Sequence, residues 1–261
     1  MPGKSSISKK HSKVIIGTRG SELALWQAHF VKAQLEEIGL EVELKIIKTQ
    51  GDKILNLSFD KIEGKGFFTK ELEEELLAGK IDIAVHSHKD LPTNYPEGLT
   101  IAAVSERENP AELLLILKDC VEFHQKLAIK FNGMVGTSSN RRKAQLLSMR
   151  PDLEIEELRG NVPTRIQKLR NEDYDAIMIA KAGVQRLGID LSEFHVEELD
   201  PIELVPAPAQ GVLAIQIREK DTDLFKRLQA LNKPEVAEQI AVERKVLNMF
   251  DGGCHMPLGC Y

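Results

Sequence analysis

Short apolar runs alternate with helical patterns along nearly the whole chain, and this alternation constrains the fold more than any other feature. Apolar runs of strand length occur at residues 14–17, 42–49, 81–87, 99–105, 132–139, 153–159 and 174–180. Most of them are followed by a stretch with helical periodicity, such as 21–39 or 141–149. This alternation is typical of α/β domains, in which crossover helices connect parallel strands. We therefore predict an α/β protein with parallel sheets.

The pattern separates into two units, at residues 13–105 and 109–204, which agrees with the two domains that 261 residues favour. A further apolar run at 210–218 follows the second unit, and we expect it to return to the first. The chain is then helical until it reaches a glycine-rich loop at 251–259. The sequence thus predicts two α/β units and a separate C-terminal part.

Composition and charge exclude several classes of protein. The net charge of −5 argues against a nucleic-acid-binding protein. No run approaches the roughly 18 apolar residues of a membrane helix. Residues 1–13 are basic and polar, lack the apolar core of a secretory signal and are predicted to be a disordered tail. The three cysteines form no closely spaced zinc set. We expect a cytoplasmic protein without a metal, a membrane or a nucleic acid as partner.

Basic residues gather in the turns that follow the predicted strands. In open α/β sheets, ligands bind beyond the carboxyl ends of the strands, where helices begin. Basic and hydroxyl side chains in these turns are Arg19, Ser21, Ser87, Lys89, Ser138, Arg141, Arg142, Arg159, Arg165 and Arg186. Helix N-termini present free N–H groups, and guanidinium groups bind carboxylates and phosphates through two hydrogen bonds. A single such arginine is more often solvated surface charge, but the repeated pattern predicts a cleft for a polyanion.

Asp90 is an acid among these cations, in the segment HSHKDLP. Nearby positive charge favours its ionised form, so we expect it to hold N–H donors or to stabilise a cation formed during a reaction. A salt bridge with Lys89 or with a neighbouring arginine is the alternative. His86 and His88 share one face of a strand, but the sequence offers no third ligand for a metal.

Cys254 lies in a loop-like segment, with Gly252 and Gly253 before it and Pro257 and Gly259 after it. A cysteine on a loop is more often kept for its reactivity than for packing, although an incidental thiol remains open. The stretch EGKGFFTKE also contains glycines but lacks a phosphate-loop pattern. We predict a loop there that presents Lys65.

Eight motifs in this chain resemble, in the same order, those of the porphobilinogen deaminase (hydroxymethylbilane synthase) family. They are GTRGSELAL, EGKGFFTKE, HSHKDLP, GTSSNRR, LRGNVPTR, AGVQRLG, APAQGVLAI and GGCHMPLG, and the match extends from about Val14 to Gly259. The resemblance implies an enzyme that joins four porphobilinogen molecules head to tail with release of ammonia. It also implies a covalent dipyrromethane cofactor on which the chain is built before hydrolysis releases hydroxymethylbilane.

The resemblance implies a role for each matching residue. Asp90 would be the catalytic carboxylate, and Cys254 would attach the dipyrromethane. Each porphobilinogen brings two carboxylates, so the growing chain needs several cationic side chains. The binding residues that the resemblance implies for cofactor and substrate are Arg19, Ser21, Lys65, Phe68, Ser87, Lys89, Ser138, Arg141, Arg142, Arg159, Arg165, Arg186 and Gln210.

The implied fold has two domains, similar to those of type II periplasmic-binding proteins, around a cleft, with a small α+β third domain. Their predicted limits are 14–107 with 206–229 for the first, 108–205 for the second and 230–261 for the start of the third, which would be truncated. The resemblance also favours a monomer.

Two departures from the family pattern keep other interpretations open. Ala209 occupies a position where the family commonly has glycine, and the third domain of the family continues beyond the position of Tyr261. An inactive, truncated deaminase is therefore one alternative. The other is a non-catalytic solute-binding protein of the same two-lobed fold, closing around a polycarboxylate.

Overall fold

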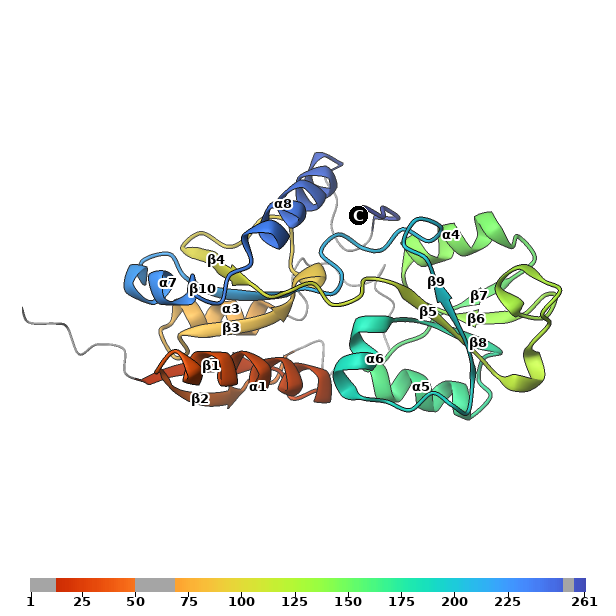
Figure 1. Cartoon of the computed structure of the whole chain (residues 1–261), viewed down its shortest axis with the longest axis horizontal. Coiled ribbons are helices and arrows are strands. Elements are labelled where there is room, and N and C mark those ends of the chain that lie inside the picture. Colours follow the sequence, from red (N-terminus) through yellow and green to blue (C-terminus); the bar gives the residue numbers. More distant parts are fainter. Residues whose placement is uncertain (1–12, 50–68, 251–255) are drawn as a thin grey trace, which may run out of the picture.

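The computed structural model describes residues 13–49, 69–250 and 256–261, and in it the chain forms two lobes side by side (Figure 1). Each lobe is built around a five-stranded sheet, with strand order β2-β1-β3-β10-β4 in the first and β7-β6-β8-β5-β9 in the second. The strands are β1 (Lys13–Thr18), β2 (Glu41–Ile46), β3 (Ile83–Ser87), β4 (Leu99–Val104), β5 (Glu112–Ile116), β6 (Met134–Gly136), β7 (Glu154–Glu156), β8 (Ala176–Ala180), β9 (His195–Leu199) and β10 (Leu213–Arg218). The predicted α/β class with two lobes is confirmed.

Helices pack on the sheets and bury their apolar faces there. The helices are α1 (Glu22–Glu37), α3 (Lys70–Leu77), α4 (Asn140–Met149), α5 (Val162–Arg170), α6 (Lys181–Leu187), α7 (Thr222–Leu228) and α8 (Pro234–Met249), with 3-10 turns η2 (His88–Asp90), η3 (Lys118–Cys120) and η4 (Lys126–Ala128). In β5, Leu113 and Leu115 join one core cluster while Leu114 and Ile116 join another. The second sheet is thus buried on both faces, as the twofold alternation of side chains along a strand requires.

The sheets are mixed, and the prediction of parallel sheets is wrong for one strand in the interior of each. β1 pairs in parallel with β2 and β3, and β6 pairs in parallel with β7 and β8. β10 runs antiparallel to β3 and β4, and β5 runs antiparallel to β8 and β9. β5 and β10 are the strands that the chain enters directly after crossing between the lobes. Because no helix precedes either one as a crossover, nothing imposes the parallel direction.

The two crossing segments, 105–111 and 200–212, lie against each other between the lobes. Glu108 N donates to Gly211 O at 3.0 Å, and Ser105 N donates to Leu213 O at 3.1 Å. Gly211 has φ +89°, and a Cβ there would lie 2.2 Å from Glu108 O. Only glycine permits this close approach of the two backbones. The domain limits at 107/108 and 205/206 fall within these segments and stay a prediction.

Helix α8 is anchored to both crossing segments through one carboxylate. Glu243, which is 5% exposed, pairs with Arg107 and accepts a hydrogen bond from Ala209 N at 2.7 Å. Ala209 itself has φ +63°, in the left-handed region. The alanine noted in the sequence therefore stands where the backbone favours glycine.

Candidate active site

A pocket opens at the carboxyl ends of β1 and β3 in the first lobe and brings together four of the predicted residues. Its lining includes Arg19, Ser21, Gln27, Thr69, His86, Ser87 and Asp90. Asp90 ends the η2 turn that follows β3, and its side chain is exposed. The structure thus supports the expectation that ligand-binding groups gather at this edge of the sheet.

Two hydroxyl groups in the pocket are fixed by hydrogen bonds that they accept. Ser21 is the N-cap of α1, and its side chain accepts from Ala24 N at 3.4 Å. Ser87 Oγ accepts from Gln27 Nε2 at 2.9 Å. Since each oxygen accepts from the protein, each hydroxyl proton can donate to a ligand. Arg19 adds a positive charge to the same lining.

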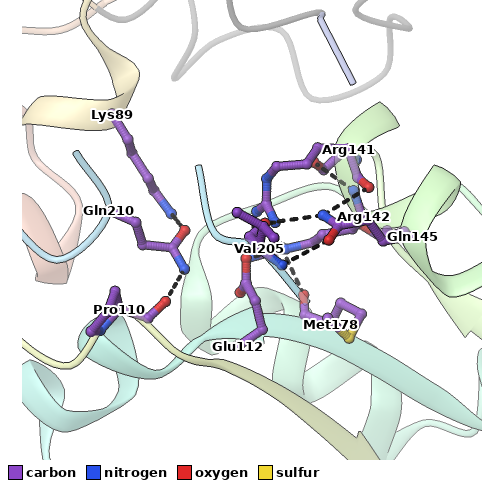
Figure 2. A network of polar contacts seen from close by, with 11 residues as sticks. Lys89, Pro110, Glu112, Arg141, Arg142, Gln145, Met178, Val205 and Gln210 are labelled. Carbon is purple, nitrogen blue, oxygen red and sulfur yellow. Dashed lines mark hydrogen bonds and ion pairs between the residues drawn. The ribbon is translucent and has the colours of Figure 1, made fainter. Parts of the chain in front are cut away.

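Lys89 precedes Asp90, but its side chain points to the two crossing segments, 105–111 and 200–212, which together we call the joint between the lobes (Figure 2). Its Nζ donates to Gln210 Oε1 at 3.1 Å, and Gln210 Nε2 donates to Pro110 O at 2.7 Å. Burial lowers the pKa of Lys89 to about 8, and the charge of Asp90 opposes this shift. Lys89 and Gln210 therefore link the turn that carries Asp90 to both crossing segments.

In the second lobe, Arg141 and Arg142 begin α4 and surround Glu112, the first residue of β5 (Figure 2). Arg142 donates to Glu112 through Nε at 3.1 Å and through Nη2 at 2.7 Å, and its Nη1 donates to Met178 O at 3.0 Å. Arg141 also pairs with Glu112, and its Nη1 donates to Val205 O at 2.8 Å. We call Glu112, Arg141 and Arg142 the Glu112 triad.

The Glu112 triad is buried, and Glu112 is its only acid. The two arginines are 5% and 6% exposed and Glu112 is 0% exposed. Burial alone would raise the pKa of Glu112, but the charges of Arg142, Arg141 and Lys89 and the hydrogen bond from Arg142 hold it far below its usual range. Two cations and one anion leave the triad with one net positive charge. The sequence reasoning missed Glu112 because it belongs to an apolar run, ELLLI.

Two more of the predicted basic residues lie near the start of α5, Arg159 in the turn before the helix and Arg165 in its first turn. Arg165 Nε donates to Gly160 O at 2.8 Å. Burial and the charge of Arg142 lower the pKa of Arg165 to about 10, while the charge of Asp90 raises it. Arg159 Nε lies 3.4 Å from Glu157 Oε2, and Ser138 Oγ donates to Leu158 O at 2.9 Å. The field of Asp90 thus reaches a guanidinium group of the opposite lobe.

Arg186, predicted to bind the ligand, contacts the joint between the lobes. Its Nη2 donates to Gly211 O at 2.6 Å, and its guanidinium carbon lies 5.8 Å from the centre of the Trp26 ring on α1. Burial lowers its pKa to about 10. The prediction that Arg186 lies in the turn after the strand is wrong, because Arg186 is the second-last residue of α6, where it contacts α1 and the crossing segment 200–212.

Arg244 on α8 is a residue that the sequence reasoning missed. Its guanidinium donates to the backbone oxygens of His88, Leu91 and Pro92, which flank Asp90 on both sides. It also lies 5.4 Å from the centre of the Tyr95 ring. Arg244 thus holds the turn that carries Asp90. No local signal could have indicated this, because the contact spans about 150 positions of the chain.

His86 and His88 each have a partner other than a metal. His86 Nε2 lies 3.0 Å from Gln216 Oε1, and His88 Nε2 lies 3.3 Å from Tyr95 Oη. Burial lowers their pKa values to about 4 and about 3. Within the part of the chain that the structure describes, no three His, Cys, Asp or Glu side chains gather as metal ligands. Nor does any helix in that part have the length and apolar content to cross a membrane.

Comparison with known proteins identifies the family. The family model "Porphobilinogen deaminase, dipyromethane cofactor binding domain" matches residues 14–226. This chain belongs to the porphobilinogen deaminase family. The porphobilinogen deaminase of a Nitratiruptor species is 48% identical over 248 residues, which cover 95% of this chain and 77% of that protein. That of Lawsonia intracellularis is 44% identical over 251 residues, covering 95% and 79%.

Among solved structures, the periplasmic VFT2 domain of Bordetella pertussis BvgS is 14% identical to this chain, with a TM-score of 0.49. The alignment covers 89% of this chain and 94% of the BvgS chain. The two mixed five-stranded sheets agree with the predicted α/β class, and the likeness to type II periplasmic-binding proteins stays a prediction. Three of the predicted site residues, Lys65, Phe68 and Cys254, lie outside the described residues.

Proposed function

We propose that the pocket around Asp90 is the active site in which this porphobilinogen deaminase joins four porphobilinogen molecules head to tail, with release of ammonia, to form hydroxymethylbilane. The observation that supports this most is the meeting of Asp90 with Arg19 and two hydroxyl donors, Ser21 and Ser87, at one pocket. Each substrate molecule offers pyrrole N–H donors and two carboxylates. A carboxylate acceptor beside cations and hydroxyl donors matches both kinds of group.

The donor set fits the dipyrromethane that the family's domain binds. A dipyrromethane built from porphobilinogen carries several carboxylates, and the described part of the site offers Arg19, Lys89 and Arg165 as cations near Asp90. Cys254 would hold it through a thioether, as the family motif implies. When bound, the dipyrromethane supplies the pyrrole carbon to which the first substrate is joined.

Asp90 performs two tasks in this proposal. Its carboxylate accepts hydrogen bonds from pyrrole N–H groups, which orients the ring that is about to react. When porphobilinogen loses ammonia, the substrate becomes electron-poor and positively charged, and a preorganised negative charge stabilises it. The exposed position of Asp90 on a rigid turn, held by Arg244, keeps the carboxylate available to the ligand.

The arginines of the second lobe have a supporting task. The Glu112 triad carries one net positive charge within the second lobe, and Arg165 adds a second. These charges attract carboxylates of the growing chain without requiring a direct contact for each arginine. Arg159 and Ser138 lie in the turns before α5 and α4, and Arg186 and Gln210 act at the joint between the lobes.

Further parts of the proposal concern the partners and the location of the protein. Its partner is the small molecule porphobilinogen, the chain is a cytoplasmic monomer, and it binds neither nucleic acid nor membrane.

The proposal is tested by measuring the intact mass of the purified, denatured protein and its turnover of porphobilinogen. We expect an excess mass equal to two linked pyrrole units, absent in Cys254→Ser, and release of one ammonia per porphobilinogen consumed. A protein that carries the excess mass but does not consume porphobilinogen would overturn the activity. Normal loading of Cys254→Ser would overturn the assignment of the anchor.

A further inference from the structure

A chain of buried hydrogen bonds runs beneath the pocket in the first lobe. His86 Nε2 lies 3.0 Å from Gln216 Oε1. Gln216 Nε2 donates to Glu73 Oε1 at 3.1 Å, and Thr69 Oγ1 donates to Glu73 Oε2 at 3.5 Å. All four side chains are at most 6% exposed. His86 and Thr69 also line the pocket, so both ends of this chain reach the ligand site.

The chemistry of the amide group determines the direction of the chain. The carboxylate of Glu73 accepts the N–H of Gln216, so the amide oxygen of Gln216 faces His86. An amide oxygen can only accept, and His86 Nε2 must therefore carry a proton. Glu73 is not among the residues that line the pocket, but it fixes the orientation of Gln216 and, through it, the tautomer of the imidazole.

His86 is neutral in this environment. Burial and the positive charge of Arg19 lower the pKa of His86 to about 4, although the hydrogen bond to Gln216 acts to raise it. A neutral imidazole has a single N–H group. With the proton on Nε2, the other nitrogen, Nδ1, is an acceptor.

We propose that Glu73 and Gln216 hold His86 as its Nε2–H tautomer, so that Nδ1 is a neutral hydrogen-bond acceptor on the wall of the pocket that contains Asp90. The ligand group is an N–H donor, such as a pyrrole N–H or the aminomethyl group of the substrate; this part rests on the proposed function. A neutral acceptor beside Asp90 suits a reaction that creates positive charge, because an imidazolium there would repel the forming cation. Glu73 and Gln216 are positioning residues.

The tautomer is measured by 15N NMR of the full chain labelled at histidine, with the His86 signals assigned by their loss in His86→Gln. We expect a neutral ring with its proton on Nε2 at pH 7. A proton on Nδ1, or an imidazolium at that pH, would overturn the proposal. The measurement needs no turnover, so its result is independent of whether the proposed activity is found.

Glu73→Gln tests the role of the buried carboxylate. An amide at position 73 can donate to Gln216 Oε1, which lets Gln216 reverse and donate to His86. We expect some or all of the His86 signal to change to the Nδ1–H tautomer, and kcat/KM for porphobilinogen to fall about three- to tenfold, the equivalent of one neutral hydrogen bond. The control is Glu74→Gln, which makes the same chemical change on the solvent side of the same helix and should alter neither quantity.

Two results would contradict this positioning role. One is a fall in kcat/KM of Glu73→Gln with the tautomer unchanged, which would indicate that the carboxylate acts only through stability. The other is a changed tautomer with wild-type kcat/KM, which would show that Nδ1 makes no contact of importance to the reaction.

Discussion

The two lobes present similar sequences at their strand ends but use them differently. In the first lobe, the turns after β1 and β3 surround a pocket, and Asp90 there is exposed. In the second lobe, the turn after β6 places Arg141 and Arg142 in buried contact with Glu112. The first edge can make direct contacts with a ligand, whereas the second supplies a fixed positive charge. A basic turn at a strand end therefore indicates the place of a site but not the task of each side chain.

We call the sheet edge with the Asp90 pocket the open edge, and the sheet edge with the Glu112 triad the filled edge. Asp90→Asn removes the negative charge of the open edge and should have the largest effect. The amide keeps the size of the side chain but cannot stabilise a cation equally well, so we expect kcat to fall about a hundred- to a thousandfold, as for other preorganised electrostatic groups. The thermal midpoint should not change, because the side chain is exposed. Asp119→Asn, an exposed aspartate on η3 in the other lobe, is the control. Substantial turnover by Asp90→Asn would remove Asp90 from the chemistry.

Glu112→Gln tests how much the buried charge of the Glu112 triad contributes to stability at the filled edge. The change leaves two buried guanidinium groups with a neutral partner, which should lower the free energy of unfolding by about 3 kcal/mol. Urea unfolding measures this loss, and Glu154→Gln, an exposed acid on β7 of the same lobe, should change stability by less than about 0.5 kcal/mol. Wild-type stability in Glu112→Gln would mean that the two arginines do not depend on this charge. The lobes would then differ less than the contacts indicate.

The sequence predicted the open edge better than the filled one, and the reason is physical. Arg19, Ser21, Ser87 and Asp90 follow strands that share one sheet edge, so periodicity alone brings them together. Glu112 meets Arg141 and Arg142 across about 30 positions, and its neighbours form an apolar strand in which an acid has no expected partner. β5 and β9 were not predicted, because the prediction relied on strands followed by helices. Gln210 was indicated only by the family resemblance, since a buried glutamine in a crossing segment leaves no periodic signal.

Lys89 is affected by the charge of Asp90 at the open edge and by the charges of the Glu112 triad at the filled edge. The pH dependence of kcat/KM tests whether the charge of Lys89 contributes to substrate binding. Its pKa of about 8 lies below the ordinary lysine value, so the amine loses its charge as the pH rises through 8. Since that charge attracts substrate carboxylates in the proposal, kcat/KM should fall by about fifteenfold between pH 8 and pH 9.5, because the charged fraction of Lys89 falls from about one half to about one thirtieth. The fold is not weakened by this titration, since a lysine pKa that is depressed in the folded state makes stability rise over the same range.

The matched variant for this pH dependence is Lys89→Arg. Its guanidinium stays charged across the range, so the alkaline fall of kcat/KM should disappear or move to higher pH. Initial rates at low porphobilinogen concentration, measured across both sides of the Lys89 pKa, give both profiles. Identical profiles for the two proteins would show that another group titrates there and that Lys89 serves only to bind Gln210.

The joint between the lobes allows the smallest of these tests, at Ala209. This residue has φ +63°, a conformation that costs an L-residue with a Cβ about 1–2 kcal/mol relative to glycine. Its methyl group is fully buried beside Val104, Val212 and Ile240. Removing the methyl group therefore loses apolar burial, which offsets part of the stability gained by relieving the backbone. We expect Ala209→Gly to raise the free energy of unfolding by about 0.5–1 kcal/mol, measured by urea unfolding. Gly211→Ala is the opposing variant, since its Cβ would meet Glu108 O at 2.2 Å, and it should be strongly destabilised. A loss of stability in Ala209→Gly would mean that packing of the methyl group outweighs the backbone cost, and that this chain accommodates alanine at the joint without strain.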